Sequence, residues 1–256
     1  MSGKIIYLGD DHLQGAAAYL AGILLHHGLA FDHVPSAESP PTEFALTRYA
    51  AYIISDYQAS RLGIAAMAHI AARVEQGAGL IMLGGWESFY GRLGEYHNSP
   101  LAAVLPVTMQ SCDDRRNFAQ PCLIEKVADH EILAGLPWDQ PPGIGGLNAI
   151  TAKPGTETLL VAAQFSAHRD EHVYTFVPTG RAPLLIVGRH GAGRTAALAT
   201  DVAPHWVGGF VDWGDQRIVQ EVGGGMIEVG NWYARFFRNL VAWAGQIDSL
   251  IDSLID

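Results

Sequence analysis

The chain has 256 residues, of which 49% are hydrophobic and 16% are charged. This balance is typical of a folded globular protein and excludes an intrinsically disordered one, and the length fits a single α/β domain. The net charge is −10, and no run of Lys or Arg is present that could neutralise phosphates. We therefore expect no nucleic-acid partner.

The cysteines and the apolar segments indicate the compartment. Cys112 and Cys122 lie ten residues apart with no metal ligands at short spacing, so we expect free thiols. The first residues lack the apolar region and cleavage site of a signal peptide. No apolar stretch approaches the roughly 20 residues that span a bilayer. These features predict a cytoplasmic protein without a membrane partner.

Short apolar runs alternate with helix-forming segments in the first hundred residues. We predict strands at 4–8, 29–34 and 52–54, helices at 13–27 and 64–76, and a fourth strand that ends at Gly84-Gly85. Strands that alternate with helices predict a mostly parallel sheet flanked by helices, with right-handed crossovers. The expected fold is therefore α/β.

The second half of the chain has a different pattern. Residues from about 100 to 180 contain eight prolines and short β-like runs, which predicts an inserted β-rich lobe within one domain covering 1–246. Two apolar strands, 183–189 and 194–200, are joined by His190-Gly191-Ala192-Gly193, which favours a hairpin turn over a phosphate loop because no helix follows. A last helix is expected at 231–244. The tail 247–256 repeats Asp-Ser-Leu-Ile and is either a frayed end or a short amphipathic helix.

Polar clusters follow three of the predicted strands. Asp10-Asp11-His12, Ser55-Asp56-Tyr57 and Trp86-Glu87-Ser88 each stand where a strand ends. Because the carboxyl ends of parallel strands meet at one edge, where open α/β sheets bind their ligands, these clusters should converge. The sequence therefore predicts a binding or active site at this edge.

These segments resemble the class I glutamine amidotransferase-like superfamily, in particular its uncharacterised glutamine amidotransferase-like branch, which is similar in build to ThuA-like proteins. The resemblance spans nearly the whole chain up to about Gly245 and implies a flavodoxin-like sheet. The residues that carry it are Leu8-Gly9-Asp10-Asp11, Ser55-Asp56-Tyr57, Gly84-Gly85-Trp86-Glu87-Ser88-Phe89-Tyr90-Gly91, Asp113-Asp114-Arg115, Gly145-Gly146-Leu147-Asn148 and Asp201-Val202-Ala203-Pro204-His205-Trp206.

The resemblance also implies a nucleophile elbow after a central strand, with a cysteine that is completed by a histidine and a glutamate. Here Trp86 stands where the cysteine is expected, and tryptophan offers no ionisable nucleophile. His205 matches the family histidine, but Val207 stands where the glutamate is expected. Ser88 has bulky neighbours at minus two and plus two, so we interpret it as a structural serine that could cap a helix. We therefore expect no glutamine hydrolysis.

The remaining polar residues could support other chemistry. Converging carboxylates with a histidine could act as general acid and base or bind a divalent cation, although no known metal motif is present. Aromatic faces beside carboxylates and amides are common in sites for sugars and other small polar molecules. Pro204 makes a helix at Asp201–His205 doubtful. The expected catalytic residues are Glu87, Asp114 and His205; the expected ligand-binding residues are Asp10, Asp11, Asp56, Tyr57, Trp86, Tyr90, Arg115, Asn148, Asp201 and Trp206.

Three functions stay open on this basis. The chain could be a hydrolase-like enzyme that uses carboxylates and His205, with or without a metal. It could instead bind a small polar, sugar-like ligand without turnover. A third alternative is an assembly protein whose apolar loops form an interface in a homo-oligomer.

Overall fold

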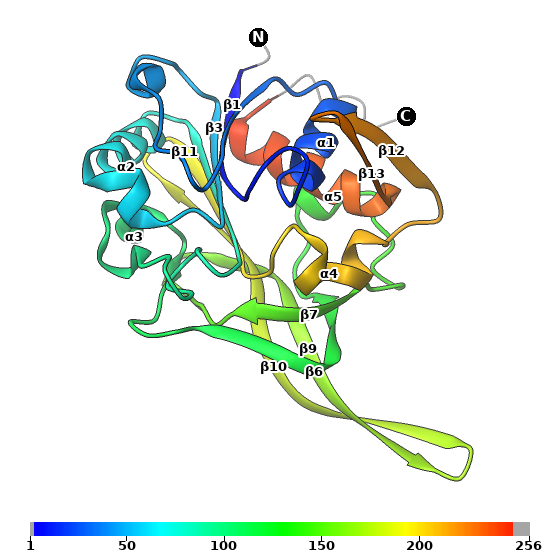
Figure 1. Cartoon of the computed structure of the whole chain (residues 1–256). Coiled ribbons are helices and arrows are strands. Elements are labelled where there is room, and N and C mark those ends of the chain that lie inside the picture. Colours follow the sequence, from blue (N-terminus) through cyan, green and yellow to red (C-terminus); the bar gives the residue numbers. More distant parts are fainter. Residues whose placement is uncertain (1–2, 248–256) are drawn as a thin grey trace.

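A nine-stranded mixed sheet forms the centre of the molecule (Figure 1). The computed structural model describes residues 3–247, apart from the side chain of His205. The strand order is β2-β1-β3-β4-β11-β10-β9-β6-β7. Their bounds are β1 Ile5–Gly9, β2 Phe31–Val34, β3 Ala51–Ser55, β4 Gly79–Leu83, β6 Arg115–Lys126, β7 Gly143–Asn148, β9 Glu157–Asp170, β10 Val173–His190 and β11 Gly193–Leu198.

The first half of this sheet is parallel. β1 pairs in parallel with β2 and β3, and β4 pairs in parallel with β3 and β11. Every residue of β1, β3 and β4 is buried, because helices cover both faces of these strands. The α/β fold predicted from their apolar runs is confirmed.

The helices lie on the two sides of the parallel half (Figure 1). On one side, α5 contacts β3, β4 and β11, and α1 packs against α5. On the other side, α2 contacts β11 and α3. The helices are α1 Ala18–His26, α2 Ala59–Glu75, α3 Pro100–Val104, α4 Pro204–Val211 and α5 Asn231–Gly245, with short 3₁₀ turns η1 Thr42–Ala45, η2 Tyr96–Asn98 and η3 Glu131–Leu133.

The second half of the sheet is antiparallel. β11, β10, β9, β6 and β7 pair antiparallel with one another in that order, so four of the eight strand pairings are antiparallel. The β-rich segment expected at about 100–180 therefore extends the main sheet. Its strands are longer than the short runs predicted, since β9 has 14 residues and β10 has 18. Two small sheets complete the structure, β5 Val107–Thr108 with β8 Thr151–Ala152, and β12 Arg217–Val222 with β13 Gly225–Gly230.

Several predicted boundaries require correction. α1 begins at Ala18 instead of residue 13, and α2 begins at Ala59 instead of residue 64, with non-helical dihedrals at Gly63. Pro204 does not prevent a helix, because it is the first residue of α4, where a proline ring fits the backbone and no N–H is needed. The predicted hairpin between β10 and β11 is confirmed. Residues 248–256 of the expected tail lie outside the described residues.

Candidate functional site

Two aspartates occupy equivalent positions at the ends of neighbouring parallel strands. Gly9 of β1 is in register with Ser55 of β3, so Asp10 and Asp56 both directly follow their strands. Each has a left-handed backbone, with φ of 52° at Asp10 and 44° at Asp56. The backbone N–H of Asp10 donates to the Ser55 carbonyl at 2.8 Å. Left-handed non-glycine residues are uncommon and concentrate at functional sites, where the surrounding structure holds them.

Asp201 brings a third carboxylate to the same edge. It follows β11 in the short segment before α4, and its Oδ1 accepts hydrogen bonds from the N–H groups of Val202 at 2.6 Å and Ala203 at 2.9 Å. One carboxylate oxygen from each of Asp10, Asp56 and Asp201 lies within 4.8 Å of the others. We call these three residues the aspartate cluster. The predicted convergence of strand-end carboxylates therefore exists for these three.

Burial and mutual repulsion disfavour ionisation of the cluster. Desolvation and the nearby Asp56 raise the pKa of Asp10 to about 8. Desolvation raises the pKa of Asp56 to about 6, although hydrogen bonds from the backbone of Glu87 and Trp86 oppose this. Desolvation, followed by the charges of Asp56 and Asp10, raises the pKa of Asp201 well above its ordinary value. The cluster therefore holds protons near neutral pH.

Tyr7 is a member of the site that the sequence analysis missed. Its hydroxyl donates a hydrogen bond to Asp10 Oδ2 from a completely buried position in β1. Burial, the charge of Asp10 and this hydrogen bond raise the pKa of Tyr7 well above its usual range. A tyrosine hydroxyl in a strand that is buried on both faces requires a hydrogen-bond partner. The aspartate three residues after Tyr7 could therefore have identified Tyr7 as a member of the site.

The loop after β4 closes over Asp56. The N–H of Glu87 donates to Asp56 Oδ1 at 2.8 Å, and the N–H of Asp56 donates to Ser88 Oγ at 3.0 Å. Gly85 has φ of +154°, and a Cβ atom there would lie 2.0 Å from Asp56 Oδ1. Ser88 therefore joins two loops and caps no helix, and Gly85 leaves the space that the Asp56 carboxylate occupies.

Asn148 and Asp114 also hold the loop after β4 in place. The buried Asn148, at the end of β7, accepts from the N–H of Gly85 at 2.8 Å and donates to the Gly85 carbonyl at 3.1 Å and to Asp114 Oδ1 at 2.8 Å. Asp114 also accepts from the N–H groups of Tyr90 and Gly91. Desolvation raises the pKa of Asp114, and the hydrogen bond from Asn148 opposes this. These contacts assign Asp114 and Asn148 to holding the loop in place.

The exposed rim of the site carries three of the predicted residues. The Arg115 guanidinium lies over the Trp86 ring at 4.5 Å and pairs with Asp113 at 2.6 Å. Trp86 is 45% exposed. Glu87 is half-buried, and its Oε1 accepts a hydrogen bond from Gln58 at 2.8 Å. An aromatic face, a cation and a carboxylate therefore stand beside Asp56.

Other predicted residues do not join the cluster. Tyr57 is buried and donates its hydroxyl to the Glu38 carbonyl, and the buried Trp206 donates to Asn117 Oδ1 at 2.7 Å, so both belong to the packing of the core. Tyr90 stacks on His97 at 5.0 Å. Asp11 is exposed. His205 lies in the first turn of α4, but its side chain is outside the described residues.

A cavity of about 670 Å³ lies near the same end of β1 and β2. It is lined in part by His12, Gln14, Asp32 and His33. The His33 ring packs on Tyr7 with 5.0 Å between ring centroids and hydrogen-bonds the Gly9 carbonyl at 2.9 Å. The cavity could hold a small molecule, and His33 connects it with Tyr7.

Comparison with known proteins identifies the family. The model of the family described as "Putative glutamine amidotransferase", of the class I amidotransferase-like type, matches residues 12–222. The chain belongs to this family. No functionally curated protein is significantly similar to it in sequence.

Solved structures of the same architecture agree. A Salmonella typhimurium LT2 protein described as cytoplasmic is 25% identical, with a TM-score of 0.73 over 94% of this chain and 99% of its own. A second Salmonella typhimurium cytoplasmic protein is 24% identical, with a TM-score of 0.71 over 94% of this chain and 98% of its own. A ThuA-like protein of Bacteroides uniformis ATCC 8492 has a TM-score of 0.54 at 14% identity over 95% and 91%.

The end of β4 does not form the nucleophile elbow that the resemblance implies. Trp86, where that resemblance places the cysteine, is absent from the left-handed non-glycine residues of the described chain. The loop runs through turns to η2, so the strand–turn–helix of an elbow is not formed there. Cys112 is exposed before β6 and Cys122 is buried within β6, so neither thiol lies at the end of β4.

Proposed function

We propose that this protein binds a small polar molecule beside the aspartate cluster and hydrolyses it by carboxylate acid–base chemistry, without a cysteine. The observation that supports this most is the meeting of Asp10, Asp56 and Asp201 within 4.8 Å, from three different strand ends. Folding does not require three carboxylates gathered at one place, two of them buried, and repulsion between their charges destabilises the fold. Such an arrangement is typical of a site where function outweighs stability.

The separated pKa values suggest different roles for the carboxylates. Asp56 is half-buried, and with a pKa of about 6 it is mostly ionised at neutral pH, which suits a general base that removes a proton from an attacking water. Asp10, with a pKa of about 8, is mostly protonated at neutral pH and could act as the acid of the pair. Trp86, Glu87 and Arg115 would contact the ligand, and an aromatic face beside polar groups favours a sugar-like compound. His205 is a further candidate for the acid–base chemistry.

A divalent cation is a second candidate for the cluster. The oxygen ligands of one Ca²⁺ or Mg²⁺ ion lie about 2.0–2.6 Å from it, so any two of them are at most about 5 Å apart. The three cluster oxygens satisfy this limit. Asp10, Asp56 and Asp201 would hold the ion, and it would supply Lewis-acid activation of a bound water.

Activity on chromogenic p-nitrophenyl glycosides and esters tests the proposal. We expect turnover by the native protein to fall about 10²- to 10⁴-fold in Asp56→Asn, since a general base is lost. Asp129→Asn is the matched control, because Asp129 is an exposed carboxylate that pairs with Lys126 and belongs neither to the cluster nor to the residues proposed to contact the ligand. The assay is run with EDTA and with added Mg²⁺ or Mn²⁺. Equal turnover by Asp56→Asn and the native protein would contradict the acid–base role.

The cellular location belongs to the same proposal. Two structural neighbours at 25% and 24% identity are described as cytoplasmic. The helices of the described residues include none long and apolar enough to cross a membrane. We propose that this chain also acts in the cytoplasm. Fractionation of cells that produce the native protein would test this.

A further inference from the structure

β9 and β10 continue far beyond the sheet as a two-stranded arm. β6 pairs with β9 only up to Ala163, and β11 pairs with β10 only from Leu185 on. Beyond these points residues 164–180 pair only with each other, and Figure 1 shows the resulting ribbon projecting away from the body. Isolated two-stranded ribbons are marginally stable in water, so an arm of this length gains from a further contact.

The two faces of this arm differ in composition. The pairing places Phe165 opposite Pro178, Ala167 opposite Phe176 and Arg169 opposite Tyr174, so these six side chains share one face, which we call the aromatic face. Phe165 and Phe176 pack edge to face at 5.5 Å. Phe176 is nevertheless 61% exposed and Tyr174 is 59% exposed. The other face pairs Ser166 with Val177 and His168 with Thr175, and it is the more polar one.

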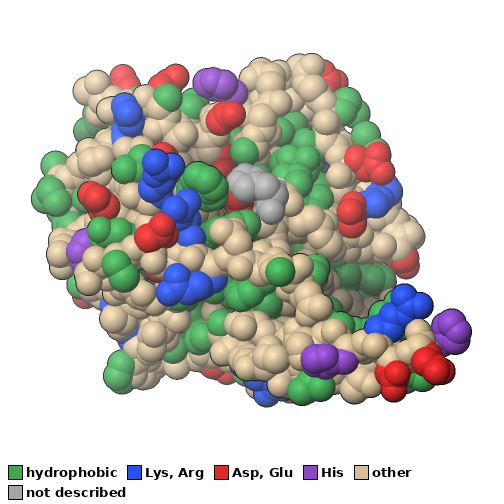
Figure 2. All heavy atoms as spheres, turned by 60° about the horizontal axis from the view of Figure 1, so that its bottom comes forward, with side chains coloured by type: hydrophobic (Ala, Val, Ile, Leu, Met, Phe, Trp, Pro, Cys, Tyr) green, Lys and Arg blue, Asp and Glu red, His purple; other side chains and the backbone are tan. Residues whose placement is uncertain are grey.

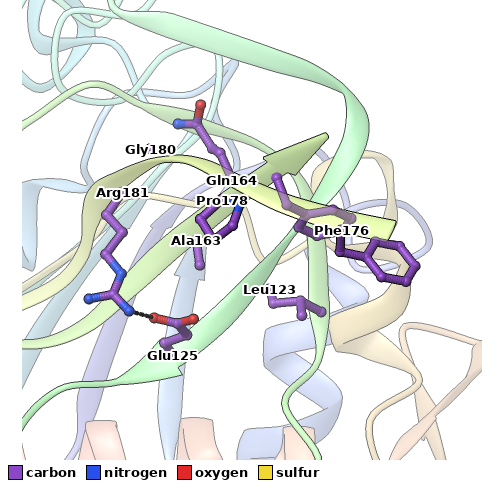
Figure 3. A pocket seen from close by; sticks show the side chains of 9 residues that line it. Leu123, Glu125, Ala163, Gln164, Phe176, Pro178, Gly180 and Arg181 are labelled. Atoms are coloured by element: carbon purple, nitrogen blue, oxygen red, sulfur yellow. Dashed lines mark ion pairs between the residues drawn. The ribbon is translucent and has the colours of Figure 1, made fainter. Parts of the chain in front are cut away.

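The aromatic face continues into a groove at the base of the arm. This groove has a volume of about 790 Å³ and is lined by Leu123, Ala163, Phe165, Phe176 and Pro178, together with Glu125 and Arg181. Figure 3 shows the Arg181–Glu125 ion pair, at 2.7 Å, at one end of the groove and Phe176 at the other. The groove therefore offers an apolar floor with one positive and one negative group at its inner end.

The tip of the arm carries charges of both signs as well. Arg169, Asp170 and Glu171 are exposed around the turn, and the Arg169 guanidinium lies over the Tyr174 ring at 5.7 Å. Figure 2 shows basic, acidic and histidine side chains gathered at the end of the projecting arm. The arm thus has an aromatic middle between a tip and a base that each present a cation and an anion.

We propose that the aromatic face of the arm binds the same face of a second copy of this chain, with the two arms antiparallel about a two-fold axis. In that arrangement the tip of each arm lies on the base groove of its partner. Arg169 meets Glu125 of the second copy, Glu171 at the turn meets Arg181, and the Phe165–Phe176 pairs meet at the axis. The surface is self-complementary in charge, with a cation and an anion at each end, as a two-fold interface requires.

The sedimentation behaviour of the full-length chain tests this proposal. We expect the native protein to form a dimer at micromolar concentration and Phe176→Asp to raise the dissociation constant at least about tenfold, because central aromatic residues dominate such interfaces. Thr175→Asp is the matched control, since it introduces the same charge on the neighbouring residue but on the opposite face. Diluted until they are monomeric, all three proteins should unfold at similar temperatures, since both positions are exposed in the monomer. A monomeric native protein, or a dimer that Phe176→Asp leaves unchanged, would overturn the proposal.

A charge exchange tests the antiparallel arrangement itself. Arg169→Glu and Glu125→Lys should each weaken the dimer, and the double variant should recover much of the affinity because the pair is restored with the signs reversed. Residues 125 and 169 lie at opposite ends of the arm, so recovery must come from contact between two chains. Failure of the double variant to recover would overturn the arrangement proposed here.

Discussion

The two halves of the sheet differ in the direction of strand pairing and in what their strands place at the surface. In the parallel half, the strands β1, β3, β4 and β11 of five or six residues are almost completely buried, and the edge strand β2 is half-buried. The carboxyl ends of β1, β3 and β11 hold charged side chains together at one edge. In the antiparallel half, strands of up to 18 residues run out of the body with many exposed side chains. Parallel strands must be covered by crossover helices, whereas a hairpin needs only a turn, so it can extend into solvent. The parallel half therefore holds the candidate site, and the antiparallel half carries the arm that we propose binds a second copy.

The largest expected difference between the halves concerns core packing. Ile53→Ala, in the fully buried β3, should lower the free energy of unfolding by about 4 kcal/mol, because it leaves a cavity among close-packed side chains. Val173→Ala, in the exposed arm, should change it by less than about 0.5 kcal/mol. Urea denaturation of both variants measures this. Similar losses in the two would show that the arm is part of the cooperative core.

A smaller effect is expected at the glycine beside Asp56. Gly85→Ala should cost about 3 kcal/mol, since its Cβ would collide with the Asp56 carboxylate and its φ of +154° disfavours a side chain. Gly28→Ala is the control: Gly28 also has a positive φ, but nothing lies within 4 Å of an added Cβ. It should lose only about 1 kcal/mol to backbone strain. Equal losses would show that Asp56 does not need the space at Gly85.

The pH dependence of stability gives the next smaller effect. The folded protein raises the pKa of Asp10 from its ordinary 3.8 to about 8, so between these values the folded state binds more protons than the unfolded state. This group therefore stabilises the fold fully below about pH 4, and that contribution is lost as the pH rises toward 8. We expect native stability relative to Asp10→Asn to fall by about 2 kcal/mol between pH 6 and 8. A constant difference between the two proteins would contradict the raised pKa.

Much of the parallel half could be predicted from the sequence, and much of the antiparallel half could not. Continuous apolar runs such as Ile5–Gly9 identify buried strands directly, and residues that follow such strands must meet at one edge. The prolines from about 100 to 180 suggested loops and short strands, yet Pro178 lies at a register shift between β9 and β10, and Pro121 lies in an unpaired stretch of β6. At such irregularities no backbone N–H is required, so proline does not interrupt the strand.

The sequence predicted the location of the candidate site better than the roles of its residues. Asp10, Asp56 and Asp201 converge as expected from the strand ends. Asp114 and Asn148 also lie nearby, but their hydrogen bonds to Gly85, Tyr90 and Gly91 hold the loop after β4. Whether a carboxylate faces a ligand or a backbone amide depends on loop conformation, which spacing along the chain does not encode.

The most direct test of the account is the titration of the aspartate carboxyl carbons by NMR, with Asp10→Asn, Asp56→Asn and Asp201→Asn used to assign the signals. We predict that the cluster titrates in separate steps, with apparent pKa values of about 6 for the step assigned to Asp56 and about 8 for that assigned to Asp10. Titration of all three carboxyl groups below about pH 4.5, the range of solvated carboxyls, would show that they do not share a desolvated site.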